Sequence, residues 1–115
     1  NLRICLFVAL IWPCISQSAV FTVDVAGPSV ASGCSAAPGD CSFISAMTMA
    51  EANPGADRIE FAIPMSDPGC DASTGVCRII LPALSSSSPS ITAPLEIDGY
   101  TQPGAMPNTI PAPGA

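Results

Sequence analysis

Proline limits how this chain can fold more than any other residue type. The chain contains 13 prolines in 115 residues, so few stretches are long enough to form an uninterrupted helix. Aromatic residues make up 5% of the chain although 49% of it is hydrophobic, so a core must be filled mainly by smaller aliphatic side chains. This length fits one small domain. The composition disfavours a helical bundle and favours short strands joined by loops.

Charge and residue types exclude several functional classes. The formal net charge is −6, with three basic and nine acidic residues, so the chain lacks the basic surface that nucleic acids need. It contains no histidine, which excludes a Ser-His-Asp or Cys-His nucleophile system and a zinc site held by histidine. We therefore predict no catalytic residues, no cofactor and no metal site in this chain, and no nucleic-acid partner.

The first 18 residues are typical of a secretory signal peptide. Arg3 precedes a nearly continuous apolar run over residues 4–15, which is followed by the small or polar residues 16–19. The run is shorter than the roughly 20 residues that span a bilayer. A signal peptide over residues 1–18, removed after Ser18 or alternatively after Ala19, is therefore favoured over a membrane anchor or a buried segment. We expect a secreted or cell-surface protein with no membrane span in the mature chain.

Four cysteines follow the predicted signal peptide and fall into two pairs of equal spacing. Six residues separate Cys34 from Cys41, and six separate Cys70 from Cys77. An even number of cysteines in an exported chain predicts disulfides, and the equal spacing favours pairing within each pair. Closing such a loop contributes about 2.5 kcal/mol in the chain-entropy model. The two other connectivities and a zinc ion held by all four thiolates remain alternatives.

One strand and one helix are predicted in the first half of the mature chain. Residues 20–25 alternate apolar and polar side chains and end at a Gly-Pro breaker. A helix over residues 42–52 is capped by Asp40 or Ser42 and stopped by Asn-Pro-Gly at residues 53–55. We expect the methionines of this helix to be core residues. Its apolar face combines Phe43, Ala46, Met47 and Ala50.

Three short apolar runs follow the helix. They cover residues 59–63, 78–81 and 95–99, and their first apolar residues lie 20 and then 16 positions apart. This spacing is close to one coil of a parallel β-solenoid, in which each coil adds a strand to the same sheet. The intervening loops are longer than hairpin turns, and the serine-rich segment 85–89 is predicted to be exposed. The pattern favours a solenoid over an antiparallel sandwich.

Three segments carry a resemblance to a known family. Residues 41–47 (CSFISAM), 54–61 (PGADRIEF) and 91–105 (ITAPLEIDGYTQPGA) resemble the N-terminal region of bacterial secreted β-helix proteins with the CSLREA motif. The run over residues 97–105 is the most specific part. The chain departs from the motif at Ile44-Ser45 and at Glu51, so we expect packing, rather than a polar pair, to hold the helix against the first coil.

The resemblance implies a mainly β fold, with an N-terminal cap followed by the first coils of a right-handed parallel β-helix. Residues 19–57 would form a strand, a loop and a capping helix, and residues 58–115 would form the first coils of a longer protein whose later coils are the partner of this segment. The implied function is a non-enzymatic capping module of an exported and adhesive surface protein. The implied motif residues are Cys41, Ser42, Phe43, Ala46, Met47, Asp57, Ile97, Asp98 and Gly99.

Acidic residues are the remaining candidates for a site. Glu96 and Asp98 alternate with apolar neighbours, so with Glu60 they are interpreted as a solvated strand face, with calcium binding or a catalytic acid as alternatives. Asp67 and Asp71 could form a weak calcium site beside Cys70. The second functional hypothesis is an extracellular polysaccharide-acting enzyme whose active site lies on later coils. In either case an extracellular glycan or protein is the expected ligand.

Overall fold

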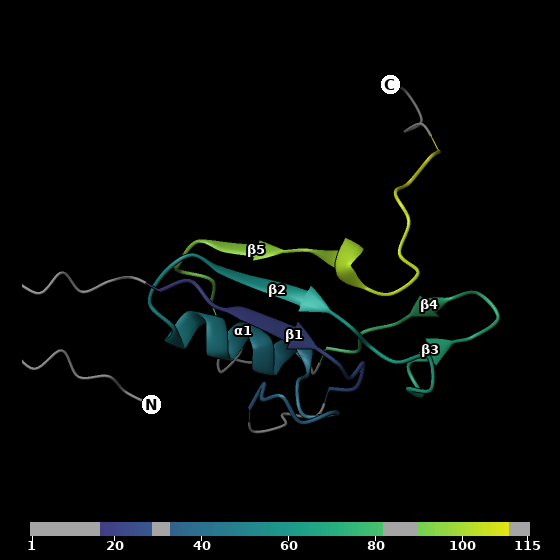
Figure 1. Ribbon diagram of the computed structural model, residues 1–115, viewed down its shortest axis with the longest axis horizontal. Coiled ribbons are helices and arrows are strands. Elements are labelled where there is room, and N and C mark those ends of the chain that lie inside the picture. Colours follow the sequence, from purple (N-terminus) through teal and green to yellow (C-terminus); the bar gives the residue numbers. More distant parts are fainter. Residues whose placement is uncertain (1–16, 29–32, 82–89, 111–115) are drawn as a thin grey trace, which may run out of the picture.

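The computed structural model describes residues 17–28, 33–81 and 90–110, and its main element is a small parallel sheet. The sheet has three strands in the order β1 (Val20–Val23), β2 (Asp57–Phe61) and β5 (Leu95–Ile97). In its register Phe21 pairs with Ile59, and Ile59 pairs with Ile97. The strands therefore lie side by side in the order in which they occur along the chain (Figure 1).

One helix and two smaller elements complete the fold. Helix α1 (Phe43–Ala52) connects β1 to β2 and contacts both strands. Figure 1 shows it on the β1 side of the sheet, away from β5. An antiparallel hairpin of β3 (Cys70–Asp71) and β4 (Val76–Cys77) follows β2, and a 3-10 turn, η1 (Gly99–Thr101), follows β5. The described part of the chain therefore consists of a small parallel sheet, a short hairpin, one helix and one 3-10 turn.

The predicted helix is confirmed together with its start and its end. Ser42 is the N-cap, and its Oγ accepts a hydrogen bond from the Ser45 amide at 3.2 Å. Asn53 ends the helix, and its amide donates to the Met49 and Ala50 carbonyls. Met49 is 40% exposed, so the prediction that the methionines of this helix are core residues is wrong for Met49, whose position falls outside the apolar face.

The core lies between α1 and the sheet. Ile59 at the centre of β2 is fully buried, and the small side chains of Ala46 and Ala50 let the helix lie close to the strands. Phe43 stacks on Phe61 with 6.0 Å between ring centroids, which fills the space at the start of the helix. Phe43 and Met47 are partly buried and pack against this core. The predicted apolar face of the helix is therefore the face that meets the sheet.

The run over residues 78–81 is not a strand, so this prediction is wrong. Strand β4 ends at Cys77, and the following segment makes isolated backbone hydrogen bonds instead of a ladder. The Arg78 amide donates to the Gly69 carbonyl, and the Ile80 amide donates to the Ala26 carbonyl. The segment therefore lies between the hairpin and the chain that leaves β1, and β5 takes the place beside β2.

Both predicted local disulfides are confirmed. Cys34 is bonded to Cys41 with 4.4 Å between their Cα atoms, and Cys70 is bonded to Cys77 across the β3-β4 hairpin. The four thiolates are thus unavailable for the alternative zinc site. The predicted signal peptide lies outside the described residues except for its last two, and the serine-rich segment 85–89 lies outside them as well. Within the described ranges, no helix has the length and apolar character needed to cross a membrane.

Candidate functional site

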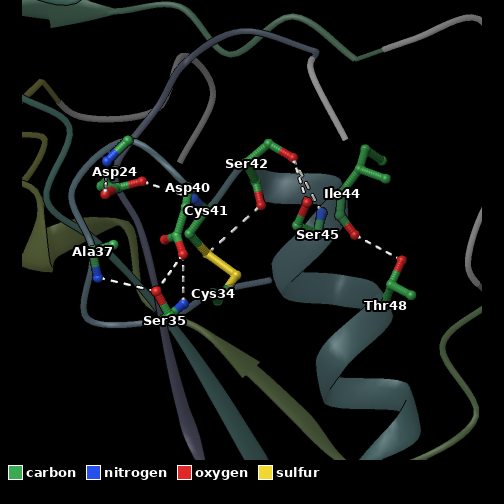
Figure 2. The surroundings of a disulfide bond; sticks show 11 residues. Asp24, Cys34, Ser35, Ala37, Asp40, Cys41, Ser42, Ile44, Ser45 and Thr48 are labelled. Carbon is green, nitrogen blue, oxygen red and sulfur yellow. Dashed lines mark hydrogen bonds between the residues drawn. A yellow bond between two sulfur atoms is a disulfide. The ribbon is translucent and has the colours of Figure 1, made fainter. Parts of the chain in front are cut away.

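The chain that leads into α1 contacts the outer edge of the sheet just beyond the end of β1. Asp24, directly after β1, donates its amide to the Cys41 carbonyl at 3.0 Å. In return the Cys41 amide donates to Asp24 Oδ1 at 2.9 Å, and Gly39 donates its amide to Oδ2 of the same carboxylate (Figure 2). This reciprocal pair, which we call the β1 edge contact, joins the loop to the residue that follows β1 by a backbone and a side-chain hydrogen bond. Asp24 was not among the predicted site residues, and its position directly after a strand is the only sequence signal that points to this role.

The Cys34–Cys41 disulfide holds the loop that makes the β1 edge contact. Cys41 is 1% exposed and belongs to the core cluster. On the outer side of the loop, Asp40 accepts hydrogen bonds from the amide and the hydroxyl of Ser35 (Figure 2). Ser42, directly after Cys41, is also buried and caps α1. The loop, the disulfide and the helix start therefore form one connected structure on the β1 side.

The outer edge of β5 has no strand beside it in the described part of the chain. The Pro94 carbonyl accepts from the Asp57 amide, and the Asp98 amide donates to the Ile59 carbonyl, so these groups face β2. Because backbone groups alternate in direction along a strand, the amides of Leu95 and Ile97 point away from β2. A loop is therefore joined to the sheet at the end of its β1 edge, whereas no strand pairs with its β5 edge in the described part of the chain.

The side chains of β5 do not all follow the expected alternation of buried and exposed positions. Leu95 packs against the core, but Ile97, predicted to face inward, is 46% exposed. Helix α1 contacts β1 and β2, so it does not cover the Ile97 side chain on β5 even though that side chain points to the same face of the sheet. Gly99 is exposed and begins η1.

Two side chains of the turn after β5 make hydrogen bonds with the backbone at the end of β2 and just beyond it. Thr101 Oγ1 accepts from the Phe61 amide at 2.8 Å and donates to the Asp98 carbonyl at 2.7 Å. The Gln102 side-chain amide accepts from the Ile63 amide and donates to the Ile63 carbonyl, which reproduces the two hydrogen bonds of a strand partner. Neither Thr101 nor Gln102 was among the predicted site residues.

The three candidate carboxylates converge on Arg58. The guanidinium lies 2.5 Å from Asp98, 3.2 Å from Glu60 and 4.0 Å from Glu96. The side chain of Arg58 is 38% exposed, so this is a partly solvated charge cluster that links β2 to β5. Such surface pairs contribute about 0–1 kcal/mol each. The arrangement agrees with a solvated strand face, in which the charges satisfy one another.

Asp57 is the one buried acidic residue of the described chain. Its Oδ1 atom accepts from the Ala19 amide and from the Asn53 side-chain amide, each at 2.8 Å. It opens onto a groove of about 430 Å³ at the start of the strands, which Ser18 and Ala19 also line. The contact with Ala19, the residue before β1, ties the start of β2 to the start of β1. Asn53, expected only as a helix stop, also orients this carboxylate.

Glu51 connects α1 to the segment before β5. Its Oε1 and Oε2 atoms accept hydrogen bonds from the amide and the hydroxyl of Thr92, at 2.9 and 2.6 Å. The Thr92 hydroxyl and then its amide lower the pKa of the Glu51 carboxyl below its ordinary value. The expectation that packing alone holds the helix at this position is therefore wrong, because Glu51 supplies a polar link.

The two residues considered for a weak calcium site, Asp67 and Asp71, accept hydrogen bonds from other groups of the chain. Asp67 accepts from the amides of Ala26 and Gly69, and Asp71 accepts from the amide and hydroxyl of Ser73. In the described ranges no three acidic or cysteine side chains are grouped so that they could hold a metal ion. These carboxylates therefore shape the loop.

Comparisons of the chain with protein-family models, with curated proteins and with solved structures found no match.

Proposed function

We propose that this chain is the non-enzymatic N-terminal capping module of an exported right-handed parallel β-helix protein. The observation that carries the proposal is the asymmetry of the sheet, in which a disulfide-linked loop is joined to the end of β1 while no described strand pairs with β5. In a solenoid each coil pairs with the coil before and the coil after it, so only a first or a last coil needs one covered edge.

The covered side has the features that a cap requires. An unpaired strand edge is a template for aggregation unless a loop, helix or charge protects it. Here the β1 edge contact between Asp24 and Cys41 occupies the end of the first strand, and α1 covers the neighbouring apolar surface. The Cys34–Cys41 disulfide fixes the covering loop. This arrangement supports β1 as the terminal strand of a longer sheet.

The open side has the features of a surface that continues. The amides of Leu95 and Ile97 point away from β2, and Ile97 exposes 46% of its surface. A following coil would pair with these amides and cover Ile97. The strand order β1-β2-β5 already extends in sequence order, so the next strand of the chain would join at this edge.

The two disulfides support the proposed location. Disulfides persist in oxidising compartments and are rare in the cytosol, so the bonded pairs fit a secreted or cell-surface protein. In that setting the later coils would present the surface that meets an extracellular glycan or protein. The capping module itself would serve in adhesion only by holding those coils.

Amide hydrogen exchange at β5 tests the proposal. The chain is compared with a longer form that includes the segment following residue 115. We expect the Leu95 and Ile97 amides to exchange rapidly in the chain and at least tenfold more slowly in the longer form, because pairing protects a strand amide. The Asp98 amide, which already bonds to Ile59, is the internal control.

The same measurement has a contrary outcome. If Leu95 and Ile97 exchange equally fast in both forms while Asp98 stays protected, the sheet does not continue at β5. The capping proposal would then be wrong.

A further inference from the structure

One buried carboxylate is only half satisfied by the chain. Asp57 is 4% exposed, and both of its hydrogen bonds, from the Ala19 amide and the Asn53 side chain, go to Oδ1. Oδ2 is buried without a hydrogen-bond partner. A buried carboxylate oxygen without a donor is unfavourable. This position therefore lacks a donor, a positive charge, or both.

Two ordinary sources of positive charge do not fit Asp57. The neighbouring guanidinium of Arg58 is directed to the acidic residues of the β2-β5 cluster. A calcium ion takes six to eight oxygen ligands, and the described ranges contain no group of three acidic or cysteine side chains suited to a metal ion. The remaining source is the backbone nitrogen that already contacts the carboxylate.

That nitrogen belongs to Ala19, which is held in place from its other side. The Ala19 carbonyl accepts from the Arg58 amide at 2.9 Å, which is the first hydrogen bond between β1 and β2. Gln17 and Ser18 precede the sheet and are exposed. Ser18 and Ala19 both line the groove that leads to Asp57. The chain could therefore begin at Ala19 without loss of the strand pairing.

We propose that Asp57 is the receptor for the α-ammonium group that leader removal creates at Ala19. This inference rests on the export that belongs to the proposed function. Hydrolysis of the Ser18–Ala19 bond by an export peptidase consumes one water molecule. The Ser18 carbonyl carbon gains the hydroxyl and leaves as a carboxylate, while the Ala19 nitrogen gains two protons, one from water and one released by the new carboxyl group.

The new ammonium supplies what Asp57 lacks. The uncleaved chain offers Asp57 one neutral N–H at this position, and the ammonium offers three donors and a positive charge at the same place. One donor keeps the bond to Oδ1, and another serves Oδ2. Asn53, whose side chain also donates to the Gln17 carbonyl, keeps its bond to Asp57. Cleavage therefore strengthens the hold on the first strand after export.

The reactivity of the α-amine tests this ion pair directly. The chain contains no lysine, so the α-amine is its only amine and can be labelled cleanly with an acylating reagent at pH 7. Two forms are prepared from a fusion partner that leaves no extra residue, one beginning at Ala19 and one at Ser18. Each unit by which Asp57 raises the ammonium pKa lowers the reactive fraction about tenfold. Arg58 and Glu96, which line the same groove, are present in both forms.

We expect the Ala19 form to be labelled at least tenfold more slowly than the Ser18 form, and Asp57→Asn to remove the difference. Equal labelling of the two forms overturns the proposal, and so does slow labelling that persists in Asp57→Asn. If Asp57→Asn does not fold, the comparison of the Ala19 form with the Ser18 form still tests the proposal, because both forms retain Asp57.

Mass spectrometry of the chain exported with its leader supplies the second test. We expect the N-terminal residue to be Ala19, and any other residue overturns the proposal. Neither result depends on the exchange of the β5 amides. Failure of the capping proposal and failure of this inference are therefore distinguishable.

Discussion

At the scale of single residues, the acidic side chains act mainly as acceptors for backbone amides. Asp24 binds the amides of Gly39 and Cys41, and Asp67 binds the amide of Ala26, which is 41 positions away in sequence. Each bond joins a loop to a distant part of the chain. The excess of acidic residues in this protein, which has a net charge of −6, thus partly reflects how its loops are built.

Gly69 permits the hairpin to approach the chain that leaves β1. A Cβ atom at Gly69 would lie 2.4 Å from the Cβ of buried Ala26, so one backbone would have to move. We expect Gly69→Ala to lower the free energy of unfolding by about 1–3 kcal/mol. The control is Gly27→Ala, because a Cβ at Gly27 meets nothing within 4 Å. Thermal unfolding of the two variants measures the difference, and equal midpoints would contradict this close approach.

The pKa of Glu51 reports the contact between α1 and the segment before β5. Because Thr92 lowers this pKa, the contact contributes at pH values above the ordinary pKa of a glutamate and is lost as the pH falls through the lowered value. We expect Thr92→Val to raise the Glu51 pKa toward its ordinary value. A carboxyl NMR titration measures the change. Asp71, whose pKa is lowered by Ser73, is the control and should not move; an unchanged Glu51 would disprove the contact.

At the scale of elements, local residues define the helix, whereas pairing defines the strands. Helix α1 begins after the Ser42 cap and ends at Asn53 because both signals lie within its own sequence. Strand β2 covers Asp57–Phe61 and so begins two residues before the predicted run over residues 59–63, because β1 and β5 pair with it there. The apolar run after Cys77 has no such partner and forms no strand.

Aspartate substitutions at Met47 and at Met49 distinguish the packed face of α1 from its exposed face. Met47 is partly buried and packs against the core, whereas Met49 is 40% exposed. We expect Met47→Asp to lower the free energy of unfolding by several kcal/mol, because it brings an unpaired charge against the apolar core. Met49→Asp introduces the same residue into the same helix and should cost less than about 1 kcal/mol. Chemical denaturation compares the two, and equal losses would mean that α1 does not pack through Met47.

At the scale of the whole molecule, one apolar core is supported by two disulfides. The core centres on Val23, Ile59 and Phe61 and draws on small helix residues. The edge beyond β5 buries little, since Ile97 and Tyr100 are exposed. A sheet with an unpaired edge buries less surface, so it offsets less of the conformational entropy lost on folding than a sheet whose edges are both covered.

This open edge predicts how stability depends on chain length. We expect the chain to unfold in denaturant with weak cooperativity, and the addition of the following segment to raise both the midpoint and the slope, because the slope scales with the surface buried. Urea unfolding followed by circular dichroism measures both quantities. A sharp transition that the added segment leaves unchanged would identify a self-sufficient domain.

Features that depend on near neighbours in the chain could be predicted from the residues alone. Cys34 could reach Cys41 across a short loop, and Ser42 could cap a helix directly after it, so spacing and residue type were sufficient. The pairing of the strands, the three carboxylates around Arg58 and the contact of Asp57 with the nitrogen of Ala19 depend instead on the folding of distant parts of the chain onto one another. The hydrogen bond between Asp57 and Ala19 joins residues 38 positions apart, and the one between Asp98 and Arg58 joins residues 40 positions apart. Local sequence patterns carry no information about contacts over such separations.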